Sequence, residues 1–165
     1  MYALLTDNAV TKVGELATLF PDTSNPNHAF ALENGALEVV EGEQKDQRFY
    51  WVTFSHYEVV DGVVTRTYTN TPKALEDVTN EDASVTQGLK SQWIAQNKAS
   101  ANSLLASTDW MVIRKAERDV AIPSDVVTAR AKIISDCTAK EAAITACTTI
   151  EELIAVVAPV TIYQL

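Results

Sequence analysis

Apolar and polar positions along the first 72 residues alternate in short runs, which is the pattern of half-buried β-strands. The clearest run is "SHYEVVDGVVTRTYT" (55–69), where Asp61-Gly62 separates two segments rich in β-branched and aromatic residues. An Asp-Gly pair suits a two-residue hairpin turn because both turn positions need a positive φ. The residues expected to alternate are Tyr57 and Val59 on the first arm and Val64, Arg66 and Tyr68 on the second.

Other parts of this region also favour strands. Asp7-Asn8 between "YALL" and "AVTKV" predicts a second hairpin, since both residues tolerate a positive φ. "ALEVV" and "RFYWVTF" have strand composition, whereas "GELATLF" predicts one or two helical turns that stop at Pro21, and "PDTSNPN" predicts a loop. We expect Phe49 and Trp51 to pack in the core. The alternative is a contact surface for another protein, because Tyr and Trp dominate interface hot spots.

From Pro72 onward the apolar residues recur at helical intervals. "TPKALEDVTNED" predicts a polar connector, and Asp82 or Ser84 could cap the following helix. That helix is expected from about 83 to 107, with polar Gln96 and Asn97 in its middle. Its apolar stripe comprises Val85, Leu89, Trp93, Ala101, Leu104 and Leu105.

A second helix is predicted to begin at Pro123, which suits a first helical turn because its missing N–H has no partner there. Its stripe comprises Val126, Val127, Ile133, Ile134, Cys137 and Ile144. A capping box, formed either by Thr148 with Glu151 or by Thr149 with Glu152, predicts a short third helix. Pro159 is expected to end this helix and "VTIYQL" to be extended.

These patterns predict an α+β protein. A small antiparallel β-rich domain is expected over 1–72, followed over 83–165 by a helical hairpin or bundle of two long helices and one short helix, with a short extended tail. Cys137 and Cys147 lie ten residues apart on helix, too far to bridge within one straight helix. We expect them to be small buried apolar groups rather than a disulfide or a metal pair.

Composition and charge narrow the function classes. A chain of 165 residues with 47% hydrophobic residues can form a packed core. The net charge of -9 disfavours nonspecific nucleic-acid binding and attachment to anionic membranes. No apolar run approaches the roughly 18 residues of a transmembrane helix. "MYALLTDNAV" has neither the basic nor the apolar region of a signal peptide, so we expect synthesis in a cytoplasm and either retention there or release in an assembly.

Catalytic residues are few. The only histidines, His28 and His56, have no metal-ligand spacing, and the glycines form no phosphate-binding loop. No serine lies in a nucleophile elbow, and neither cysteine has a histidine nearby in sequence. An enzyme would need a pocket joining one of the histidines to distant carboxylates. We therefore expect no enzymatic activity, no cofactor and no metal.

Asp109-Trp110 stands where the first helix is expected to end. The aspartate would cap that helix end or turn, and the tryptophan would fix the second helix against the first. We favour a buried Trp110, because the stripes of the two helices need a common filler. The alternative is that Trp110 anchors an interface. Arg114 and Arg118 are expected to pair with surplus carboxylates.

The segment around this pair, "NSLLASTDWMVIRKAERDVAIPSDVVTARAKI", resembles a pattern of tail-fibre assembly proteins of tailed bacteriophages and related tail-assembly chaperones. "MYALL", "FPDTSNPNHAF" and "VVDGVVTRTYT" stand in the same order as that family's other motifs, so the resemblance covers most of the chain. Where the family has "WxxYR", this chain has "VVTAR". The matching positions are Leu104, Leu105, Thr108, Asp109, Trp110, Pro123 and Arg130.

The resemblance implies a protein that binds the tail fibre or its attachment site, aids fibre assembly and stays in the virion or leaves it. The alternative is a purely structural component of the baseplate, tail or adhesin. Expected partners are a tail-fibre or baseplate protein, with a homo-oligomer as a further option. The expected locations are the host cytoplasm during assembly and the virion tail. The family implies no catalytic residues. The interaction or architectural candidates are Trp51, Tyr57, Tyr68, Trp93, Asp109 and Trp110.

Overall fold

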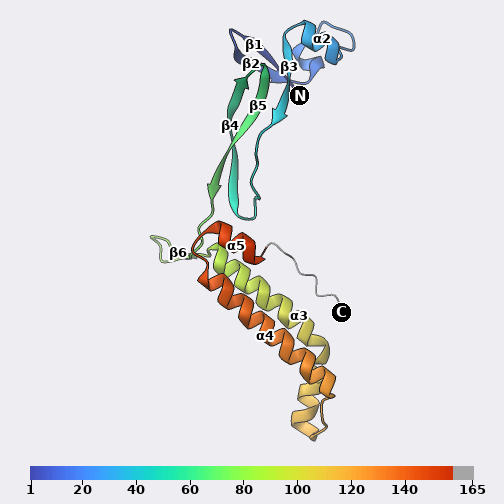
Figure 1. Ribbon diagram of the computed structural model, residues 1–165, viewed down its shortest axis with the longest axis vertical. Coiled ribbons are helices and arrows are strands. Elements are labelled where there is room, and N and C mark those ends of the chain that lie inside the picture. The colour runs from blue at the N-terminus through green and yellow to red at the C-terminus, as the bar shows by residue number, and fades with distance from the viewer. Residues whose placement is uncertain (158–165) are drawn as a thin grey trace. The chain divides into compact units, whose positions relative to one another are not determined.

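The computed structural model describes residues 1–157, and the chain forms two compact units that meet in sequence between Pro72 and Lys73. The α+β class is confirmed, because the first unit is built on a five-stranded sheet and the second contains two long helices and a short one (Figure 1). The predicted helix end at Pro159 and the extended "VTIYQL" lie outside the described residues.

The sheet of the first unit has the order β2-β1-β3-β5-β4. Both predicted hairpins are present, with φ of 52° and 63° at Asp7 and Asn8 and of 52° and 76° at Asp61 and Gly62. The strands are β1 (Tyr2–Thr6), β2 (Ala9–Gly14), β3 (Ala36–Glu41), β4 (Tyr50–Val60) and β5 (Val63–Pro72).

One strand pair differs from the antiparallel arrangement that the sequence predicts. β3 and β5 run parallel, so the sheet is mixed. The reason is the connection 42–49, which follows β5 before it enters β4. Asn70 of β5 holds this connection, because its side chain donates to the Glu43 carbonyl (3.2 Å) and accepts from the Lys45 amide (2.9 Å). The β4–β5 hairpin then returns the chain beside β3 in the same direction as β3.

Two short helices complete the first unit. α1 (Leu16–Leu19) ends before Pro21 as predicted, whereas α2 (His28–Glu33) is not predicted by the apolar pattern. Asn27 caps α2 by accepting from the amide of Phe30 at 2.9 Å. The fully buried side chains of this unit include Ala3, Ala31, Ala36, Phe49 and Val64.

The expectation that Phe49 and Trp51 both pack in the core is half correct. Phe49 is buried, but Trp51 is 62% exposed, so the prediction of a core position for Trp51 is wrong. The amides of Phe49 and Tyr50 donate to the Asp46 carbonyl at 2.9 and 3.0 Å, which forms a turn directly before β4. This turn breaks the alternation, so Phe49 and Trp51 do not share one face of a strand.

The second unit begins with a small hairpin that the sequence analysis read as a polar connector. Its strands are β6 (Val78–Thr79) and β7 (Val85–Thr86), so Val85 lies in a strand and is exposed, not part of a helical stripe. Asp82 and Ser84 cap no helix, because the carboxylate of Asp82 accepts from the amide of Ser84 at 3.0 Å within the hairpin turn. The helix consequently starts later than predicted.

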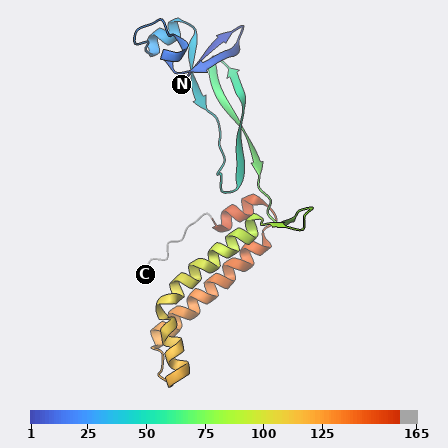
Figure 2. The same cartoon turned by 180° about the vertical axis from the view of Figure 1, so that it is seen from behind.

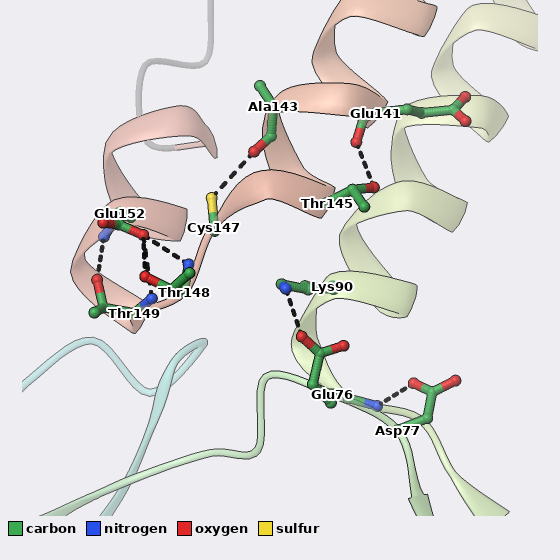
Figure 3. Close-up of polar contacts among 11 residues, drawn as sticks. Glu76, Asp77, Lys90, Glu141, Ala143, Thr145, Cys147, Thr148, Thr149 and Glu152 are labelled. Atoms are coloured by element: carbon green, nitrogen blue, oxygen red, sulfur yellow. Dashed lines mark hydrogen bonds and ion pairs between the residues drawn. The ribbon is translucent and has the colours of Figure 1, made fainter.

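α3 (Leu89–Arg118) starts at a glycine for a steric reason. A Cβ at Gly88 would lie 2.4 Å from the backbone of Glu76, closer than any side chain can approach. The preceding chain segment satisfies the first helical amides, since Leu89 donates to the Ala74 carbonyl at 2.9 Å and the Asp77 carboxylate accepts from the Gly88 amide at 2.8 Å. Lys90 also pairs with Glu76 (Figure 3).

The first long helix does not end at Asp109-Trp110. α3 continues to Arg118 and stops at Asp119, which has a left-handed backbone with φ 54°. The carboxylate of Asp109 does not cap the helix, because Arg130 uses it, and "MVIRKAER" consists largely of good helix formers. The predicted junction at Asp109 is therefore wrong by about two and a half turns.

α4 (Ser124–Ala146) follows Pro123 as predicted, and α5 (Ile150–Val157) begins at the predicted capping box. Glu152 donates its amide to the Thr149 hydroxyl (3.2 Å), and its carboxylate accepts from the Thr149 amide (3.3 Å), as Figure 3 shows. α3 and α4 lie side by side along their length in Figures 1 and 2, and α5 lies near the start of α3. The buried residues of this unit include Leu89, Ala101, Ile144, Cys147, Ile150, Leu153 and Val157.

Candidate interaction surfaces

Arg130 makes several of the polar contacts that join the two long helices. Arg130 of α4 donates through Nη1 to the Leu105 carbonyl (2.9 Å) and the Thr108 hydroxyl (2.5 Å), and through Nη2 to the Asp109 carboxylate (2.9 Å). The side chain of Arg130 is only 17% exposed, so little water competes for these bonds. The planar guanidinium can satisfy several acceptors at once, which a lysine could not do in this geometry. We call this cluster the Arg130 clamp.

Trp110 lies outside the clamp, and the expectation that it fills the space between the helices is wrong. It is 51% exposed. It follows the buried Ala101 by nine residues, about two and a half helical turns, so it leaves α3 on the side away from α4. The Arg114 guanidinium lies 4.7 Å from the centre of its ring. Within the part of the chain that the structure describes, Arg114 Nε has no hydrogen-bond partner, so ring stacking is its main contact.

A groove runs along one side of the α3–α4 pair. Its cavity volume is about 240 Å³, with Ala101 and Cys137 in its lining. Lys98 and Glu141 form an ion pair at 3.3 Å at one end of the groove. Asn97 of α3 also links the two helices, because its side-chain amide donates to the Cys137 backbone carbonyl at 2.9 Å. The polar Asn97, expected in the middle of the first helix, therefore bonds across the helix pair.

Both cysteines are free thiols, as predicted. Cys147 is buried and Cys137 is half-buried. Burial raises the pKa of both thiols, and a hydrogen bond to Glu141 raises that of Cys137 further. Thiols with a raised pKa are poor nucleophiles at neutral pH.

The first unit has its own surface cluster on β4 and β5. Tyr57 pairs with Arg66 across the hairpin, and Phe54 pairs with Tyr68. A β-bulge between Phe54 and Tyr57 brings these two rings to one face, with their centres 5.1 Å apart. The Arg66 guanidinium lies 5.3 Å from the Phe54 ring centre and 5.5 Å from that of Tyr68.

Glu41 of β3 completes this aromatic–arginine cluster. Its carboxylate lies 3.5 Å from Arg66 Nη1 and accepts a hydrogen bond from the Tyr68 hydroxyl. That hydrogen bond is the main cause of a raised pKa at Tyr68. Tyrosine and arginine are among the residues enriched at interface hot spots, so this cluster is a candidate contact surface.

The structure does not bring the six interaction or architectural candidates from the sequence together in one site. Tyr57 and Tyr68 meet in the aromatic–arginine cluster, and Asp109 belongs to the Arg130 clamp. Trp51 and Trp110 are exposed on different units, and Trp93 is half-buried on α3. The sequence analysis missed Glu41, Phe54, Asn97 and the bonding role of Arg130 in these sites.

The histidines contact hydroxyl groups. His28 Nδ1 lies 3.0 Å from the Tyr2 hydroxyl, and His56 Nδ1 lies 3.0 and 3.2 Å from the hydroxyls of Ser55 and Thr67. Over residues 1–157, no three His, Cys, Asp or Glu side chains lie where they could share a metal ion. None of the described helices combines the length and apolar character needed to cross a bilayer.

No protein-family model matches the sequence, and neither curated proteins nor solved structures include one that is significantly similar to this chain.

Proposed function

We propose that this protein binds a tail-fibre or baseplate polypeptide of a tailed bacteriophage and aids assembly of the fibre. The Arg130 clamp carries the proposal. Arg130, one of the positions that resemble the tail-fibre assembly family, donates across the helical hairpin to three others: the Leu105 carbonyl, the Thr108 hydroxyl and the Asp109 carboxylate. The resembling segment thus contains residues that join the two long helices, and this supports the proposal.

The same segment supports a binding role through its exposed tryptophan. The clamp fixes α3 by its inner side, which leaves Trp110 and the stacked Arg114 on the outer side. Tryptophan and arginine are the residues that most often dominate binding energy at protein interfaces. A half-exposed tryptophan is accessible to a partner, which supports a binding role for this side of α3.

Co-expression with the fibre polypeptide of the same phage tests this function. We expect the fibre to form soluble trimers with this protein and to aggregate without it. Trp110→Ala should reduce the yield of soluble fibre at least tenfold while the protein itself stays folded. Ser103→Ala is the matched control, because Ser103 lies seven residues earlier on the same outer side of α3.

One outcome would contradict the assembly role: a fibre that trimerises and stays soluble without this protein. Mass spectrometry of purified virions then separates the remaining cases. A protein absent from particles acts transiently, whereas one present in a fixed ratio to the tail proteins is a structural component of the baseplate, tail or adhesin.

A further inference from the structure

Asn34 ends α2, and it is the one asparagine in the sequence that a glycine follows. The backbone nitrogen after an asparagine can attack the carbonyl carbon of the asparagine side chain and close a five-membered ring. A side chain on the attacking residue hinders this approach, and Gly35 has none. Asn34-Gly35 is therefore the position in this sequence where such a ring forms most readily.

The surroundings of the pair are open. Asn34 and Gly35 are both exposed. Gly35 has a left-handed backbone with φ 73°, and a Cβ placed on it would meet no non-neighbouring atom of residues 1–157 within 4 Å. Water can therefore reach a ring formed here, and no neighbouring side chain has to move to admit it.

Two hydrogen bonds hold the pair in an unreactive conformation. Asn34 Nδ2 donates to the Phe30 carbonyl at 2.8 Å, and the Gly35 amide donates to the Leu32 carbonyl at 3.2 Å. At the ψ of 20° that Asn34 adopts, the Gly35 nitrogen points away from the Asn34 side chain. Both hydrogen bonds must therefore break before the nitrogen can attack.

α2 is short enough to open without unfolding of the whole unit. It has six residues, and a helix of this length has little stability of its own. Its first turn depends on the cap that Asn27 provides to the Phe30 amide. Of its side chains, Ala31 is buried and Phe30 is half-buried, while the others are exposed. Short, exposed elements of this kind open at a lower free energy than that of global unfolding.

We propose that Asn34 is a site of spontaneous deamidation and that opening of α2 sets the rate. The Gly35 nitrogen loses its proton to water and forms a bond to Asn34 Cγ. The Cγ–Nδ2 bond breaks, and Nδ2 takes up a proton from water and leaves as ammonia. Water then opens the ring. Addition of water at Cγ gives aspartate, and addition at the Asn34 main-chain carbonyl carbon gives isoaspartate. The net reaction consumes a water molecule, releases ammonia and needs no oxidant or cofactor.

Neither product fits the end of α2. The nitrogen that donates to the Phe30 carbonyl is replaced by a carboxylate oxygen, so two acceptors face each other. The new negative charge lies at the C-terminal end of a helix, next in sequence to Glu33, where the helix dipole disfavours it. Isoaspartate also adds a carbon atom to the main chain between α2 and β3. The modification therefore loosens α2.

Storage of the purified full chain in mildly alkaline buffer, followed by tryptic digestion and tandem mass spectrometry, tests the proposal. The tryptic peptide 13–45 contains Asn25, Asn27 and Asn34, so the first two are internal controls. We expect Asn34 to be converted first, to a mixture of the two acids, with the isoaspartate detected by an isoaspartyl methyltransferase. If Asn34 keeps its amide for as long as Asn25 and Asn27 keep theirs, the proposal is wrong.

A variant tests whether α2 controls the rate. Asn27→Ala removes the N-cap and should speed conversion of Asn34 by roughly twofold to thirtyfold, the factor by which loss of such a cap shifts a helix-opening equilibrium. Ser24→Ala is the matched control, because Ser24 is exposed in the loop before α2, and it should leave the rate unchanged. The wild-type chain in urea gives a second measure, since its fully open site should be converted faster than the folded one. Equal rates in the folded wild-type chain, in Asn27→Ala and in urea would overturn the control by α2.

Discussion

Removing Arg130 should destabilise the helical hairpin more than any other single change at a charged residue of α3 or α4. Arg130→Ala deletes three hydrogen bonds from a guanidinium that is 17% exposed. Hydrogen bonds with a charged partner contribute about 1.5–3 kcal/mol each when both groups are buried. The Leu105 carbonyl and Thr108 hydroxyl lie in a partly buried position, so their bonds to Arg130 should retain part of that value.

The third bond contributes less, because the Asp109 side chain is mostly exposed and water competes for it. Exposed ion pairs contribute about 0.2–1 kcal/mol. We expect a total loss of about 2–3 kcal/mol for Arg130→Ala, a large part of the roughly 5–15 kcal/mol typical of a folded domain. Asp109→Ala should cost only about 0.5–1 kcal/mol, since it removes the exposed bond alone.

Urea unfolding followed by far-UV circular dichroism measures both changes, because the helical signal comes mainly from α3 and α4. Arg118→Ala is the control, as an arginine of the last α3 turn that is exposed. The Arg130/Asp109 double variant should show a coupling energy of about 0.5–1 kcal/mol. The clamp would be refuted if Arg130→Ala destabilised the protein by no more than Arg118→Ala does.

Three further predictions concern single side chains. Trp110→Ala should change the melting temperature by less than about 3 °C, because the ring is half exposed and no cavity forms, and differential scanning calorimetry checks this. The Glu152 pKa lies below its ordinary 4.5 through hydrogen bonds from Thr148. Since the folded pKa is depressed, this cap stabilises above about pH 4.5 and is lost as pH falls through the folded pKa. In the Glu152→Gln variant, the free energy of unfolding should therefore fall less steeply as the pH is lowered below about 4.5. Glu41→Gln should lower the raised pKa of Tyr68 in a spectrophotometric titration, and an unchanged titration would contradict their hydrogen bond.

Signals that act over a few residues predicted their structures correctly. Asp7-Asn8 and Asp61-Gly62 form hairpin turns because the turn geometry depends only on the residues within it. Pro123 and the Thr149–Glu152 capping box start helices for the same reason. In each case the side chains that decide the conformation are neighbours in sequence, so no distant partner can change the outcome.

Asp109 shows why the remaining structure was not predictable from local pattern. An aspartate before a polar stretch can cap a helix or bond elsewhere, and the choice here depends on Arg130, which lies 21 residues further along the chain. Arg130 takes this carboxylate, α3 continues to Arg118, and Trp110 lies on the side of α3 away from α4. The parallel pairing of β3 with β5 likewise depends on Asn70 holding the connection before β4.

The aromatic–arginine cluster was predicted in part for a related reason. The alternation of Arg66 and Tyr68 along β5 places both side chains on one face, and sequence shows this directly. Phe54 is three residues from Tyr57, a spacing that puts side chains on opposite faces of a regular strand. Only the bulge between them brings both rings to one face. A bulge depends on the partner strand, so sequence pattern alone assigns Phe54 to the wrong face.

The Arg130 clamp separates helix pairing from partner binding, the two roles that the sequence analysis weighed as alternatives for Trp110. If the tryptophan filled the hairpin core, any change that weakened binding would also unfold the protein, and selection for partner recognition would be tied to selection for stability. Arg130 joins the helices through backbone and polar groups instead, so the outer side of α3 is free to vary without loss of the fold. The expected combination for Trp110→Ala, intact folding with lost fibre solubilisation, follows from this separation. A variant that lost both properties together would return the tryptophan to a structural role and remove the main physical support for a binding surface on α3.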